Sequence, residues 1–73
     1  MAVKERDKIR VALLTNSLSQ VWLINRLEER GISTDKAELS SALSGTRKGA
    51  KIDNIIKTSR EILDEYESKM KKG

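Results

Sequence analysis

The chain has 73 residues, a formal net charge of +4 and neither cysteine nor histidine. A chain of this length forms one small domain with a thin core, and the missing residue types exclude zinc fingers, Cys–His nucleophilic sites and redox motifs. The first residues alternate in charge, and no apolar run approaches the ~20 residues of a membrane span. We therefore expect a cytoplasmic protein without a signal peptide.

The first predicted helix covers about Lys4 to Asn16. Ile9, Ala12 and Leu13 share one side of it, at the three- and four-residue spacing of an amphipathic helix. The stretch 16–19, Asn-Ser-Leu-Ser, then interrupts the apolar pattern, so the helix should end there.

A second amphipathic helix follows over residues 19–30. Ser19 is a good N-cap and Gly31 marks the end of the helix. The apolar positions recur at helical spacing, and they are Leu23, Leu27 and either Val21 or Ile24.

The third predicted helix runs from about Asp35 to Ser44. Asp35 and Glu38 have the spacing of a capping box, with Asp in the place of Ser or Thr, so Asp35 should cap the helix. The apolar residues of the segment are Ala37, Leu39, Ala42 and Leu43. Lys36, Ser40 and Ser41 remain for the other face, which is free to touch a partner.

Gly45 and Gly49 bracket a turn, and a last helical region extends over about residues 51–70. Thr58 and Glu61 form a second possible capping box, so this region is either one helix or two. No segment alternates with a period of two residues over the length of a strand. The sequence predicts a single all-α domain over residues 1–73, with four or five helices.

The charges are unevenly distributed along the chain. Cations gather between residues 47 and 57, where Arg47, Lys48, Lys51 and Lys57 stand against one Asp53, whereas Glu61, Asp64, Glu65 and Glu67 follow in the last helix. Lys48 and Lys51 flank a predicted helix start, where the macrodipole already favours anions. A phosphate would be stabilised there by the dipole and by both side chains.

This order of elements resembles the Cro/C1-type helix-turn-helix family of bacterial and phage regulators. The similarity covers roughly residues 4–66 and depends on Gln20, Leu23, Leu39-Ser40, Gly45 and Arg47-Lys48. The chain also looks like the small regulators of lysis-lysogeny switches in temperate phages of Gram-positive bacteria. The resemblance implies a helix-turn-helix over about residues 19–44, here with an extended second helix and turn.

In that family the helix after the turn lies in the major groove, and the following loop contacts the DNA backbone. Carried over by position, the DNA-binding residues are Gln20, Lys36, Ala37, Ser40, Ser41, Thr46, Arg47 and Lys48, and the helix start adds Lys51. The resemblance therefore implies a transcriptional regulator that binds double-stranded operator DNA. We expect a homodimer, because one short recognition helix reads few base pairs.

The third helix also supports a different partner. It carries Asp35 and Glu38, which repel phosphates, and it lacks the Arg, Gln or Asn that most often reads G or A. The alternative is an antirepressor, or modulator of repression, that docks on a phage repressor protein. Its docking residues would be Thr34, Asp35, Lys36, Glu38 and Ser41.

Trp22 and the glycine loop 45–49 are the other features of the sequence that could indicate a binding or catalytic role. Trp22 either covers the edge of the core or anchors a partner. The segment 45–49 is too short for a P-loop, and the carboxylates of the last helix have no evident pocket. We therefore expect no enzymatic activity, no cofactor and no metal site.

Overall fold

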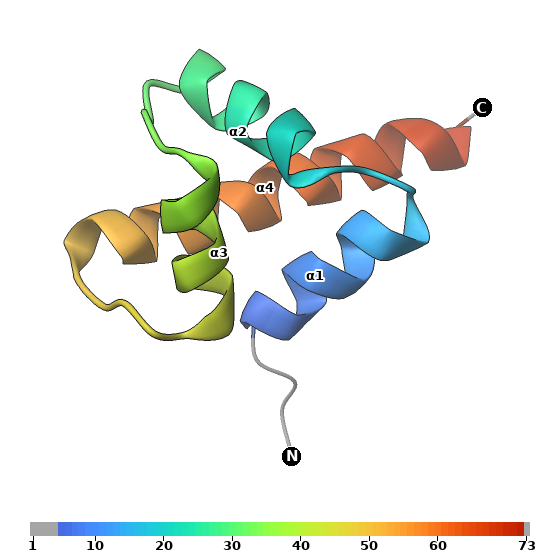
Figure 1. The fold of residues 1–73 in the computed structure, drawn as a ribbon. Coiled ribbons are helices and arrows are strands. Elements are labelled where there is room, and N and C mark those ends of the chain that lie inside the picture. Colours follow the sequence, from blue (N-terminus) through green and yellow to red (C-terminus); the bar gives the residue numbers. More distant parts are fainter. Residues whose placement is uncertain (1–4, 73) are drawn as a thin grey trace.

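The computed structural model describes residues 5–72, and these residues form four helices and no strand (Figure 1). The helices are α1 (Glu5–Thr15), α2 (Gln20–Glu29), α3 (Lys36–Ser44) and α4 (Ala50–Lys72). The predicted all-α domain is thus confirmed, with four helices in place of the four or five expected. Lys4, the predicted start of the first helix, lies outside the described residues.

Side-chain caps fix where α2 and α3 begin, as the sequence predicts. The Ser19 hydroxyl accepts a hydrogen bond from the Trp22 N–H at 3.1 Å, and the Asp35 carboxylate accepts one from the Glu38 N–H at 2.7 Å. Each bond satisfies a backbone donor that has no partner within its helix. The six residues from Arg30 to Asp35 connect the two helices.

The end of α3 is a left-handed glycine cap. Gly45 has a φ of +82°, and the Thr46 N–H donates to the Ser41 carbonyl at 3.1 Å, which closes a Schellman turn. A Cβ at Gly45 would lie 3.4 Å from the Arg6 guanidinium of α1. The cation thus lies at the negative end of the α3 dipole, where it is stabilising.

The last helical region is one continuous helix, α4, of 23 residues. The predicted alternative, a break at Thr58 and Glu61, is wrong. Isoleucines and leucines before and after this point lie in the same core, and Ser59 between them is fully buried. A break would turn the second half of this apolar stripe away from the other helices.

The core lies where all four helices meet. It consists of buried aliphatic side chains from every helix, namely Ile9, Leu13, Leu23, Leu27, Leu39, Ala42, Leu43, Ile52, Ile55, Ile56, Ile62 and Leu63. Ile24 rather than Val21 completes the apolar face of α2, because Ile24 packs against this core while Val21 is 52% exposed. Ala37, grouped with the apolar positions of α3 in the sequence, is exposed.

The arrangement leaves α3 at one side of the molecule and the C-terminal half of α4 at the other (Figure 1). α1 contacts both α3 and α4, and α2 also contacts both. Among the described residues, no helix is long and apolar enough to cross a membrane.

Candidate nucleic-acid interface

The outer face of α3 is exposed and built from small or flexible side chains. Lys36, Ala37, Ser40 and Ser44 face solvent, and Ser41 is half-buried, because Leu39, Ala42 and Leu43 occupy the core side of the helix. This division follows from the helical period of 3.6 residues. The short side chains of this face let another molecule approach the α3 backbone closely.

A side-chain hydrogen bond joins this face to the start of α2. The Ser40 hydroxyl donates to the Gln20 amide oxygen over 3.0 Å. The structure therefore brings together Gln20 and Ser40, two predicted site residues that are far apart in sequence.

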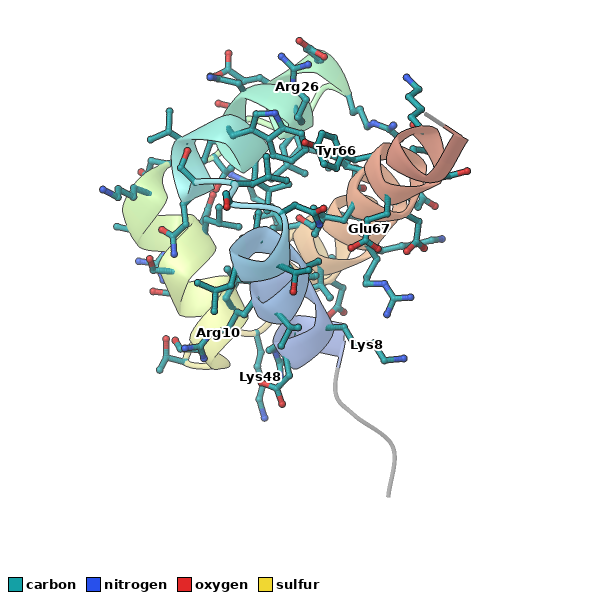
Figure 2. The ribbon with its side chains drawn as sticks, turned by 90° about the vertical axis from the view of Figure 1, so that its right-hand side faces the viewer. Lys8, Arg10, Arg26, Lys48, Tyr66 and Glu67 are labelled. Atoms are coloured by element: carbon teal, nitrogen blue, oxygen red, sulfur yellow. The ribbon has the colours of Figure 1, made fainter. Side chains whose placement is uncertain are left out.

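Arg10 of α1 belongs to the same surface and was missed in the sequence. It lines a shallow hollow of about 180 Å³ together with Gln20, Ser40 and Ser44. Arg10 is exposed, and Figure 2 shows it on the same side of the molecule as Lys48. No local pattern marks it, because its proximity to α3 arises only when α1 packs across the end of that helix.

The loop after α3 presents its cations to solvent. Thr46, Arg47, Lys48 and Lys51 are all exposed. The Thr46 hydroxyl lies 3.3 Å from the Ser41 carbonyl and donates to it, so this side chain helps to close the end of α3. The loop is thereby held against the helix that it follows.

Glu38 lies among these cations and connects three segments of the chain. Its carboxylate accepts a hydrogen bond of 2.7 Å from the Thr34 hydroxyl, and it lies 3.1 Å from the Lys51 ammonium and 3.9 Å from the Arg47 guanidinium. The Thr34 hydrogen bond is the main cause that lowers the pKa of Glu38, and the two cations add to it. The turn, the loop and the first turn of α4 thus meet at one carboxylate.

The remaining predicted site residues are not part of this ion cluster. Lys36 and Lys48 take part in no salt bridge among the described side chains. The Asp35 carboxylate is used as the α3 cap. The surface therefore combines two unpaired cations, two cations that share one carboxylate, and a row of small side chains.

The acidic half of α4 lies away from this surface and is partly neutralised. Glu65 lies 2.6 Å from Arg30, and Asp64 lies 3.8 Å from Arg60. Trp22 of α2 packs against this half of α4, with its ring centroid 5.3 Å from that of Tyr66 in an edge-to-face arrangement. It is half-buried at the margin of the core, which favours the structural alternative for this residue.

Comparison with protein-family models, with curated proteins and with solved structures found no match to this chain.

Proposed function

We propose that the chain is a helix-turn-helix transcriptional regulator that binds operator DNA. α3 would lie in the major groove, and the loop 45–49 with the start of α4 would contact phosphates. The observation that supports this proposal is a row of small polar side chains on α3 surrounded by exposed cations from α1, the loop and α4. The resemblance to Cro/C1-type regulators supports a role in a phage-type genetic switch.

The dimensions and charges of DNA agree with such a surface. The major groove is about 12 Å wide and admits one α-helix, with a row of phosphates along each edge. Arg10 lies beside Ser40 and Ser44 of the α3 face, Lys48 lies in the loop that follows α3, and Lys36 begins the helix. Arg10 and Lys48 would meet the backbone while Lys36, Ala37 and Ser40 approach the bases.

Base recognition by α3 would be modest in strength. Hydroxyl groups bond to several bases, and Ala37 can contact only a thymine methyl group. Lys36 is the one long donor at the start of α3 within the described face. Much of the affinity should therefore come from phosphate contacts, which depend on salt.

The repressor-docking alternative is less well supported. It requires Asp35 and Glu38 to face a basic partner, but Asp35 caps α3 and Glu38 is bound by Thr34 and Lys51 of the same chain. A partner would have to compete with these contacts.

A salt-dependent binding series on duplex DNA tests the proposal. Lys48→Ala should weaken binding about equally on all sequences and lower the salt slope by roughly one. Lys69→Ala, which removes an exposed lysine near the other end of α4, is the matched control and should leave the slope unchanged.

Neutralising Glu38 distinguishes DNA from a protein partner. Glu38→Gln frees Arg47 and Lys51 for phosphates and should tighten DNA binding, whereas on a phage repressor it should weaken a complex that uses this carboxylate. The gel shift uses promoter DNA that lies next to the gene for this chain. If neither the natural chain nor Glu38→Gln binds this DNA, the DNA-binding proposal is wrong.

A further inference from the structure

A second, apolar hollow of about 230 Å³ lies beside the polar hollow that Arg10 shares with α3. This leucine hollow is lined by Arg10, Leu13, Leu14, Leu18, Gln20 and Leu43. Arg10 and Gln20 line both hollows and therefore form the boundary between them. The leucine hollow is thus continuous with the surface that we propose binds DNA.

The turn after α1 builds the leucine hollow. Ser17 adopts a left-handed φ of +56°, and its N–H donates to the Leu14 carbonyl at 3.1 Å. The Leu18 N–H donates to the Leu13 carbonyl at 2.8 Å, which completes a Schellman turn. Leu18 therefore packs back against the core, whereas Leu14 is left at the rim with 81% of its surface exposed.

The position of Leu14 sets it apart from other exposed apolar residues. A single exposed leucine is ordinary on a soluble protein. Leu14, however, lies one helical turn after Arg10 on the same face of α1, and both line the hollow with Gln20. Apolar surface and groups that can bind an anion are therefore open to the same ligand.

The polar groups at the boundary are oriented for an anion. The Ser40 hydroxyl donates to the Gln20 amide oxygen at 3.0 Å, so the amide nitrogen is left to donate to a ligand and has no partner among the described residues. The Arg10 guanidinium likewise takes part in no salt bridge among the described side chains. Two donors of this kind suit the oxygens of a phosphate.

We propose that the leucine hollow receives a deoxyribose of the operator backbone while Arg10 and Gln20 bind the adjoining phosphate. The inference deepens the proposed DNA binding and rests on it. Along a DNA strand every sugar adjoins a phosphate, so one ligand presents an apolar C–H edge next to anionic oxygens. This order matches an apolar hollow next to a pair of N–H donors.

The chemistry of the hollow favours DNA over RNA or a protein. Deoxyribose lacks the 2′-hydroxyl of RNA, so no such group has to be buried against leucines without a hydrogen bond. A helix of a partner protein is about 10 Å across with its side chains and needs a longer groove than this hollow offers. Leu14 is therefore assigned to the sugar, with Arg10 beside it at the edge of the α3 surface (Figure 2).

A salt-dependent binding series with Leu14→Ala on duplex DNA tests the proposal. The variant should raise the dissociation constant by about fivefold to tenfold on any sequence, because apolar contact with a sugar is lost. Its salt slope should stay unchanged, since no phosphate contact is removed. Val11→Ala is the matched control, because Val11 is an exposed valine of α1 that faces the groove between α1 and α4, and it should bind normally.

A lysine at the same position tests whether Leu14 lies at the backbone. Leu14→Lys should raise the salt slope by about one, because its ammonium would reach a phosphate. Val11→Lys should leave the slope unchanged. Leu14 and Val11 are both exposed, so these variants should fold, and thermal melts check this.

Hydroxyl-radical footprinting measures the sugar contact directly, because these radicals cleave DNA at accessible deoxyriboses. The natural chain, at saturating concentration on the promoter DNA of the gel shift, should protect several sugars. Leu14→Ala, also at saturation, should lose protection at one sugar of each site and keep the others. Identical footprints for the two chains would overturn the proposal.

The binding series separates failure of this inference from failure of the proposed function. If the natural chain binds DNA and Leu14→Ala binds as tightly, the sugar site is wrong while DNA binding stands. A Leu14→Lys slope equal to that of Val11→Lys would also exclude the sugar site. If the natural chain binds no DNA, both proposals are wrong.

Discussion

At the scale of single residues, Ser59 is unusual among the buried side chains of α4. It is completely buried, and its hydroxyl has no hydrogen-bond partner among the residues that the structure describes. A buried polar group without a partner loses its bonds to water and gains nothing in return. The residue therefore lowers the stability of the core that surrounds it.

Replacing this serine should stabilise the protein. Ser59→Ala removes the unpaired hydroxyl and keeps a small side chain with high helix propensity, so we expect a gain of about 1 kcal/mol in the free energy of unfolding. Urea denaturation of the natural chain and the variant measures this gain in the free energy of unfolding. Ser68→Ala, at an exposed position of the same helix, should give only the smaller gain from helix propensity. Equal gains for the two variants would mean that burial of the hydroxyl has no cost.

At the scale of helices, the Asp35 cap determines where α3 begins. Asp35→Ala leaves the Glu38 N–H without its acceptor and should cost about 0.5–2 kcal/mol of stability. Asp35→Asn should retain most of the stability, because asparagine caps about as well as aspartate. A melt in which the alanine and asparagine variants are equally destabilised would assign the effect to charge instead of capping.

The helices that the sequence predicted best are those whose ends are encoded locally. Ser19, Asp35 and Gly45 each act through backbone groups within a few residues, so α2 and α3 could be placed to within about one residue. The continuity of α4 could not be decided in this way. A capping box at Thr58 is a local signal, and burial of Ile62 and Leu63 in the common core outweighs it.

The site was only partly predictable for the same reason. The exposed face of α3 follows from helical periodicity, and the cations of the loop are visible in the sequence. The partners of Glu38 and the position of Arg10 depend on how α1 and α4 pack against α3, which no spacing within one helix encodes. The sequence shows that Glu38 is a carboxylate on α3, but it does not show that this carboxylate is bound to cations of its own chain.

At the scale of the whole molecule, Glu38 links the turn before α3, the loop after α3 and the start of α4 through polar contacts that add to the shared core. Its folded-state pKa is below the ordinary glutamate value, because the Thr34 hydroxyl and the Lys51 ammonium stabilise the ionised form. Its contribution to stability is therefore present above the ordinary pKa of about 4.3 and is lost as the pH falls through the folded-state pKa.

Glu38→Gln should remove this pH dependence. The natural chain should be more stable than the variant at neutral pH, and the difference should shrink as the pH falls below about 4.3. Thermal melts between neutral and acidic pH measure the difference. Glu28→Gln, at an exposed glutamate of α2, is the control. A difference that stays constant with pH would show that Glu38 stabilises the fold by packing and not by its charge.

The position of Glu38 also affects how fast a phosphate could exchange at Lys51. The carboxylate is tethered to the same chain, so its effective concentration at the ammonium is fixed and does not fall on dilution. A phosphate that binds Lys51 replaces one anion with another, and on its departure the carboxylate returns without waiting for diffusion. Contacts made through Lys51 should therefore be short-lived, and Lys48, without such a competitor among the described side chains, should hold a phosphate longer.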